Sequence, residues 1–123
     1  MSVQSVVRER IAKACSMVVE VDEGAYQIAG RALPPDTVSP LDAWPVWQRT
    51  TFINYCTQEV QWYVLVALPP ASAETYIDLA DAFTNAVAQA LMPLGQIVAV
   101  TPTQIAASDT NAPLPVLQFE LIT

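Results

Sequence analysis

The run from Val60 to Leu68 constrains the fold of this chain most, because apolar side chains occupy both faces of the strand that it predicts. One face carries Val60, Trp62, Val64, Val66 and Leu68, and the other carries Tyr63, Leu65 and Ala67. A strand that is apolar on both faces has to be covered on both, as a central strand of a sheet is. Pro69 and Pro70 end the run, since proline has no N–H to donate to a neighbouring strand. The sequence therefore predicts a sheet with this strand at its centre.

Four further segments are predicted to be strands from their β-branched and aromatic residues and from the turn residues around them. They are Tyr26–Arg31, Val46–Tyr55, Gln96–Ala107 and Leu114–Ile122. Residues 56–59 would join the second of these to the central strand as a hairpin, and the polar residues 108–111 would join the last two. Pro102 predicts an edge, a bulge or a break in its strand, because proline cannot donate to the ladder. Three residues of the last strand should face the core: Leu117, Phe119 and Leu121.

Two amphipathic helices are predicted from apolar side chains at three- and four-residue steps. The first, of about four turns, places on one face Val3, Val7, Ile11, Ala14 and Val18. The second begins after Ser72, a favourable N-cap, and runs to about Met92. Its apolar stripe comprises Tyr76, Ala80, Phe83, Val87, Ala90, Leu91 and Leu94. Glu74 would lie in its first turn, where the helix dipole favours a negative charge.

The order of these elements is typical of an α+β fold, and we expect a single domain over residues 1–123. It predicts a two-layer sandwich in which two helices pack on one face of a mostly antiparallel four-stranded sheet. A loop from Leu33 to Pro45 contains four prolines, which hold the backbone extended. Trp44 and Trp47 indicate that this loop docks, on its own core or on a neighbouring subunit. The second face of the sheet would be closed by the loop or left for a partner.

Charge is scarce in this chain and unevenly placed. Only 14% of the residues are charged and 53% are apolar, against roughly 25% charged in an average soluble domain. Part of the apolar surface is therefore expected to meet other protein. After Arg49 there is no Lys or Arg, and the net charge is −7. The carboxylates of this half are Glu59, Glu74, Asp78, Asp81, Asp109 and Glu120. Such a surface repels phosphates, which excludes specific binding of nucleic acid or of an anionic membrane.

The residue types on which most enzymes and metal sites depend are missing or isolated. The chain has no histidine, and Cys15 and Cys56 stand alone, which favours two free thiols in a reducing compartment. Its three glycines lack the spacing of nucleotide-binding loops. Asp78 and Asp81 lie three residues apart on one helix face. Such a pair can share a proton or hold a cation, but it more commonly forms part of a solvated polar face. We therefore expect no enzyme activity, no cofactor and no metal.

Four residues are candidates for a subunit or partner interface. Trp44 and Trp47 would pack in the core or in an interface, because the chain lacks the positive groove that accompanies base stacking. Arg31 and Arg49, the only cations after the first helix, would be interface ion-pair anchors or lone surface arginines. The N-terminus lacks a signal peptide's apolar core, and the longest apolar run is about half of the ~20 residues that cross a bilayer. We expect a protein made in a cytoplasm, with no membrane segment.

Four segments together resemble a known family. They are the opening helix, QWYVLVALP (Gln61–Pro69), PASAETYIDLADAF (Pro70–Phe83) and the closing residues from Gly95 to Thr123. This layout resembles the tail terminator, or tail completion, proteins of long-tailed, non-contractile bacteriophages, particularly the small acidic versions from phages of actinobacteria. In that family a strand of this kind runs into a capped helix start, and the chain ends on a strand with alternating apolar residues. The resemblance covers residues 3–123 in the order of elements.

The resemblance implies a structural protein of the virion, made in the host cytoplasm. It implies a ring of six subunits that caps the head-proximal end of the tail tube, ends tube polymerisation and joins the tail to the head connector. The partners would be the chain itself, the tail tube protein and the connector or stopper protein. Because DNA passes through the tail, an acidic channel wall is expected, with Glu74, Asp78 and Asp81 near it. Two alternatives stay open: a head-tail connector or other minor tail protein, and an acidic DNA mimic that inhibits a host enzyme.

Overall fold

The computed structural model describes residues 2–21, 24–106 and 113–123, and its fold is α+β. Its helices are α1 (Val3–Cys15), α2 (Ala73–Leu91) and the short 3-10 helix η1 (Met92–Leu94). Its strands are β1 (Val18–Val21), β2 (Gly24–Gln27), β3 (Ala29–Gly30), β4 (Asp42–Asn54), β5 (Thr57–Ala67), β6 (Gln96–Ala106) and β7 (Pro113–Ile122). The predicted turn at 108–111, with Asp109, lies outside the described residues. In the part of the chain that is described, no helix is long and apolar enough to cross a membrane.

The main sheet has five strands in the order β3-β4-β5-β7-β6, which is one strand more than the four that the sequence predicts. β5 lies at its centre, as predicted, and three of its four pairings are antiparallel. The fifth strand, β3, pairs in parallel with β4 through Ala29 and Gly30. The predicted strand Tyr26–Arg31 is therefore divided, because its first part belongs to β2 and pairs with β1 in a separate two-stranded sheet. β6 is an edge strand, which is where Pro102 is tolerated.

Both helices pack on the face of the sheet that carries Trp62, Val64 and Val66. The helix α2 buries a stripe with a four-residue step, comprising Leu79, Phe83, Val87 and Leu91. The helix α1 contributes Ile11 and Cys15 to the same core, and β7 contributes the predicted Leu117, Phe119 and Leu121. Each large side chain buried in this way stabilises the fold by about 1.5–3 kcal/mol. This helix-covered region is called the body below.

The first helix ends earlier than its apolar stripe predicts. Ser16 follows α1, and its hydroxyl donates to the carbonyl oxygen of Ala12 at 2.9 Å and accepts the N–H of Gly30 at 3.1 Å. Gly30 is needed here because a Cβ atom at this position would overlap the backbone oxygen of Ala12. Val18, predicted on the helix, instead begins β1 and is half exposed.

The second face of the sheet is partly closed by the proline loop. Val38 packs against a small cluster of Ala67, Leu114 and Val116. Trp44 is only 5% exposed, so it is a core residue of this chain. The loop ends at Leu41, four residues before the predicted Pro45, which lies inside β4. Proline is tolerated there because β3 pairs with β4 only at Asp42 and Ala43, so that from Pro45 onward this side of β4 has no neighbouring strand.

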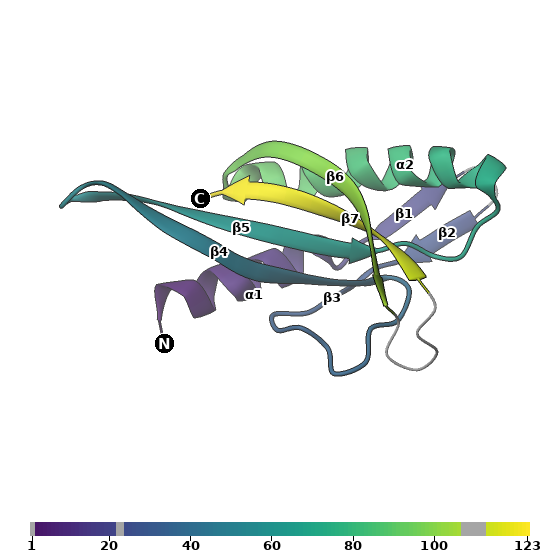
Figure 1. Cartoon of the computed structure of the whole chain (residues 1–123), viewed down its shortest axis with the longest axis horizontal. Helices are drawn as coiled ribbons and strands as arrows, with labels where there is room; N and C mark the ends of the chain where they lie inside the picture. The colour runs from purple at the N-terminus through teal and green to yellow at the C-terminus, as the bar shows by residue number, and fades with distance from the viewer. Residues whose placement is uncertain (1, 22–23, 107–112) are drawn as a thin grey trace.

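The hairpin of β4 and β5 extends beyond the rest of the sheet, as Figure 1 shows at the left of the molecule. β7 accompanies β5 only from Ala67 to Gln61, after which Thr123 and Val60 exchange two backbone hydrogen bonds of 2.9 and 3.4 Å. Beyond that point β4 and β5 pair with each other alone, to a two-residue turn of Tyr55 and Cys56. The predicted turn at 56–59 is therefore placed too late. Residues 49–60 are called the arm.

Candidate functional site

The outer part of the arm is apolar and exposed. Phe52 is 73% exposed, Ile53 58% and Tyr55 100%. A two-stranded hairpin is at best marginally stable in water without further packing, and contiguous exposed apolar side chains mark interaction sites. At the turn, the side-chain oxygen of Asn54 accepts the backbone N–H of Cys56 at 2.8 Å, which shapes the tip locally. The arm is therefore a candidate binding element, because it presents apolar side chains away from the body.

The base of the arm carries two of the predicted interface residues. Trp47 is 49% exposed, and its indole N–H donates to the hydroxyl of Thr50 at 3.1 Å. Arg49 is exposed, and its Nε donates to the amide oxygen of Gln61 across the hairpin at 3.0 Å. Among the described residues no carboxylate lies within ion-pair distance of Arg49. An indole face just before the arm and a cation at its base are therefore both exposed.

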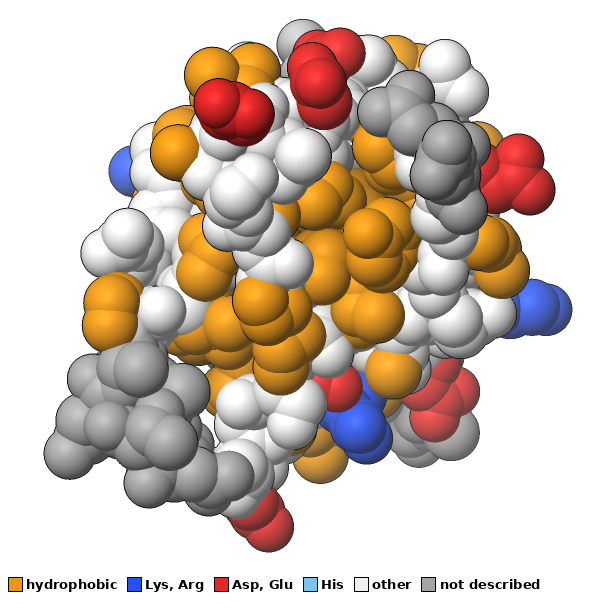
Figure 2. Space-filling model, turned by 90° about the vertical axis from the view of Figure 1, so that its right-hand side faces the viewer, with side chains coloured by type: hydrophobic (Ala, Val, Ile, Leu, Met, Phe, Trp, Pro, Cys, Tyr) orange, Lys and Arg blue, Asp and Glu red, His pale blue; other side chains and the backbone are white. Residues whose placement is uncertain are grey.

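A second apolar surface lies between α2 and the β6–β7 edge of the sheet. It consists of two adjoining hollows of ≈ 310 and ≈ 520 Å³ that share Tyr76 and Ile77. The first is completed by Ala80, Asp81, Thr84, Val100, Pro102 and Leu117, and the second by Ala71, Ala73, Gln104 and Pro115. Ile77 is 71% exposed. These hollows are called the α2–β6 groove, and Figure 2 shows hydrophobic side chains gathered at this end of the molecule.

The three predicted channel residues form an acidic ridge along α2. Glu74, Asp78 and Asp81 are all exposed, and Asp81 also lines the α2–β6 groove. Glu20 of β1 lines a hollow together with Asp78 and Asp81. No group of three or more potential ligands within the described ranges is arranged to hold a metal ion. The ridge is thus a solvated acidic surface at the edge of the groove.

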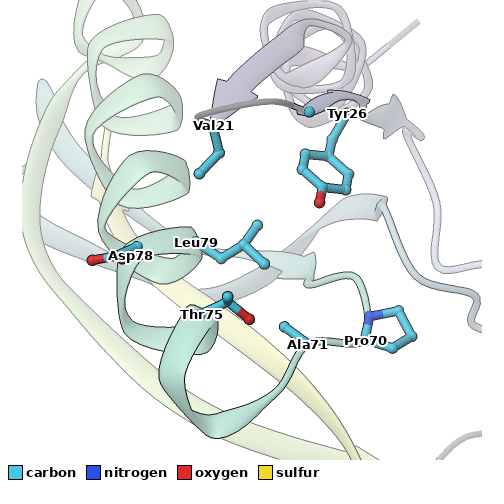
Figure 3. Close-up of a pocket in the computed structure, with 8 residues that line it drawn as sticks. Val21, Tyr26, Pro70, Ala71, Thr75, Asp78 and Leu79 are labelled. Carbon is cyan, nitrogen blue, oxygen red and sulfur yellow. The ribbon is translucent and has the colours of Figure 1, made fainter.

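A further hollow, of ≈ 260 Å³, lies between the β1–β2 hairpin and the start of α2. Figure 3 shows the hydroxyl of Tyr26 directed into it and the carboxylate of Asp78 directed away. Its other labelled walls are apolar or carry a single hydroxyl, that of Thr75. The hollow thus lacks, among the residues that line it, the pairing of a nucleophile with a base that covalent catalysis needs.

The other two predicted interface residues serve the chain's own fold. The Nε of Arg31 donates to the carboxylate of Asp42 at 3.0 Å, and Asp42 also accepts the N–H of Ser39 at 2.9 Å. Asp42 is buried while Arg31 is half exposed. This ion pair joins the two ends of the proline loop, and Trp44 next to it is buried. Sequence spacing alone did not indicate that Arg31 and Asp42 would meet.

The two cysteines differ in reactivity because they lie in the two different regions. Cys15 is buried in the body, and burial raises the pKa of its thiol to about 12. A thiol in this state is inert, since the thiolate is the nucleophile. Cys56 is free and exposed at the tip of the arm, where a reagent can reach it.

Comparison with known proteins gives no information about the function of this chain, so the functional argument depends on the surfaces described above. No protein-family profile, curated protein or solved structure matches this chain. The resemblance to tail terminators therefore stays a prediction from the sequence layout. Sequence reasoning missed both the arm tip and the groove. The available signal was the pair Phe52 and Ile53, which puts apolar side chains on both faces of a strand end beside a turn.

Proposed function

We propose that this chain is a structural virion protein of the tail terminator type. It assembles into a ring on the head-proximal end of a phage tail tube, ends tube polymerisation and joins the tail to the head connector. The observation that carries the proposal is the arm, an apolar hairpin end that finds no cover in its own subunit. Together with the resemblance of the chain to tail terminators, it favours a protein whose work is done by interfaces.

The two apolar surfaces support a ring in particular. A ring requires a heterologous contact, in which one patch of a subunit meets a different patch of the next subunit and the rotation closes. The arm and the α2–β6 groove are two such different patches, on different elements of the chain. The low charged fraction of 14% fits a protein that buries part of its surface on assembly.

The acidic ridge gives the charge of the chain a role in this function. DNA must pass through the tail without adhering, and carboxylates repel its phosphates. We place Glu74 and Asp78 on or near the wall of the channel, with Asp81 at the edge of the ridge. A ring whose structure has these carboxylates on its outer rim would contradict this placement.

The distribution of the acids argues against a DNA mimic. A mimic needs carboxylates spaced along one exposed surface as phosphates are along a strand. Here Glu20, Asp78 and Asp81 line one hollow, whereas Glu59 lies on the arm, Asp42 is buried in an ion pair and Glu120 is half-buried on β7. One small cluster is shorter than the row of carboxylates that a mimic needs, which favours the structural role.

Sedimentation velocity over a wide concentration range, combined with a tube-capping assay, tests the proposal. A closed hexamer would sediment at about 80 kDa, six times the chain mass of 13.4 kDa. Addition of the protein to polymerising tail tube protein should end growth at one tube end, measured as a shortened length distribution by electron microscopy. A protein that leaves tube length unchanged, whether as a monomer or as a ring, would overturn the assignment as a terminator.

A further inference from the structure

The arm and the groove lie at opposite ends of the same chain. The arm projects from one end of the molecule, and α2 begins at the other, where Figure 2 shows the apolar patch (Figures 1 and 2). We propose that the arm tip of one copy inserts into the α2–β6 groove of the next copy. This inference rests on the proposed ring and names its subunit contact: the occupant of the groove is a second copy of this chain.

Geometry selects a second copy over the chain's own arm. The arm points away from the body, so a single subunit cannot bring its tip to its own groove at the far end (Figure 1). A tip at one end and a groove at the other make a head-to-tail contact, and repetition of such a contact generates a ring or a filament. The same chain thus supplies both halves of the contact.

The chemistry of the two surfaces matches. The tip presents two aromatic side chains, Phe52 and Tyr55, which are among the residues that dominate interface energetics. The hollows of ≈ 310 and ≈ 520 Å³ are each large enough to receive an aromatic side chain, and Tyr76, Ile77 and Leu117 line them. The tyrosine hydroxyl can stay at the wet edge of such a groove while its ring is buried.

Charge complements the apolar match. Arg49, at the base of the arm, is an exposed cation, and one acid of the ridge, Asp81, lines the groove. Arg49 lies five residues from the end of β4, about 17 Å along the strand, so it lies outside the groove when the tip is seated. Opposite charges at an interface rim guide association and fix its orientation. This contact assigns Asp81 to the interface and leaves the other two acids to the channel.

Three apolar side chains of the arm, Phe52, Ile53 and Tyr55, are exposed in the isolated chain. Insertion into a neighbour removes the arm's apolar side chains from water and gives the two-stranded hairpin the further packing that it lacks.

Cross-linking from Cys56 tests the contact directly, since this thiol lies at the tip and Cys15 is buried. The substitution Ile77→Cys places a second thiol in the groove, and a short bismaleimide is applied to the assembled protein, in solution or on tail tubes. We expect a ladder of covalent oligomers larger than a dimer, because a heterologous contact links each subunit to two others. The matched control is Gln89→Cys, an exposed position on α2 beyond the groove, which should give no ladder.

The possible outcomes separate the contact from the ring. A ring that sediments intact but gives no ladder with Ile77→Cys overturns the tip-in-groove contact and leaves the proposed function standing. A product that stops at a dimer, formed equally without Ile77→Cys, indicates a tip-to-tip contact and also overturns it. Absence of both ladder and tube capping overturns the contact and the proposed function together.

A second pair of variants measures the strength of the contact. The double substitution Phe52→Ser with Tyr55→Ser should raise the concentration for half-assembly at least about tenfold, while the circular dichroism spectrum of the monomer stays unchanged. The control, Met92→Ser, alters a side chain that is 61% exposed outside both surfaces and should assemble like the parent. Assembly of the double variant at the parent's concentration would overturn the proposal.

Discussion

Both the inner and the outer half of the β4–β5 hairpin carry apolar side chains, but these are buried in one half and exposed in the other. In the inner half Ala43, Val64 and Val66 are fully buried, whereas in the outer half Phe52 is 73% and Tyr55 100% exposed. The cause is packing by other elements. The inner half has β7 beside it and two helices over it, and the arm has neither. An apolar strand therefore defines a core only where other elements reach it. Where they do not, apolar side chains such as Phe52 and Tyr55 stay exposed.

The largest effect is expected from a phenylalanine in the body. Phe83 on α2 is fully buried and its ring lies 5.9 Å from that of Tyr26, between centroids. Phe83→Ala removes this packing and leaves a cavity, so the free energy of unfolding should fall by about 3–5 kcal/mol. Urea denaturation followed by tryptophan fluorescence measures the loss. A loss below 1 kcal/mol would mean that the body is not the stable part of the molecule.

The close approach of α1 to β3 should be the next most sensitive feature. Gly30→Ala places a methyl group against the backbone oxygen of Ala12, and overpacking of this kind costs about 1–3 kcal/mol. The control is Gly24→Ala, whose new methyl group meets the side chain of Tyr26 at 3.3 Å and can displace it. Thermal unfolding of both variants compares them, and equal melting temperatures would contradict the close contact.

The two thiols distinguish body from arm by chemistry. At neutral pH a maleimide should label Cys56 alone in the native protein, and both cysteines after unfolding, as counted by mass spectrometry.

The stability of the protein should also depend on pH through Cys15, because burial raises the pKa of this thiol from 9.0 to about 12. The folded state keeps this thiol neutral, so the thiol's contribution to the free energy of unfolding is complete below pH 9. That contribution is lost as the pH rises towards 12. The loss is at most about 1.4 kcal/mol per pH unit.

The variant Cys15→Ala isolates this contribution, because it removes the buried thiol and leaves the other titrating groups in place. Its unfolding free energy should fall less steeply between pH 9 and 12 than that of the parent. Native labelling of Cys15 at a rate close to that of Cys56 would show that the helix α1 opens readily, and would weaken the distinction between body and arm.

The smallest effect on folding is expected from a phenylalanine in the arm. Phe52→Ala removes a side chain that is 73% exposed, so the unfolding free energy of the monomer should change by no more than about 0.5 kcal/mol. The measurement is the same denaturation as for Phe83→Ala, at a concentration at which the chain sediments as a monomer. An equal loss of unfolding free energy in Phe52→Ala and Phe83→Ala would contradict the distinction between arm and body, because the arm would then belong to the core.

The parts of the fold that depend on local pattern were predictable. The helix α2 follows from its apolar stripe, and Ser72 is its N-cap residue, although its side chain makes no capping hydrogen bond. β5 is the central strand because its run is apolar on both faces, and β6 is an edge strand as Pro102 predicts. Trp47 and Arg49, which the sequence predicts at an interface, are both exposed near the base of the arm, and their contact with a partner stays a prediction.

The parts that depend on distant pairing were not predictable. The parallel β3–β4 pair, the separate β1–β2 sheet and the ion pair between Arg31 and Asp42 each join residues whose own patterns do not specify the partner. Trp44 and Trp47 look alike in sequence, yet the first is buried and the second is half exposed. The distinction comes from the register of β4 on β5, which no local pattern contains.

The sequence by itself determined the element types, the acidity and the lack of an enzyme's usual residue types, because periodicity and composition are properties of the chain alone. Only the tertiary structure decided which apolar residues remain uncovered. The arm is exposed because β7 stops at Ile122 while β4 and β5 continue past it, and the groove exists because α2 and the β6–β7 edge leave space between them. Exposure is a property of what packs around a segment, so it is settled only when all the elements are in place.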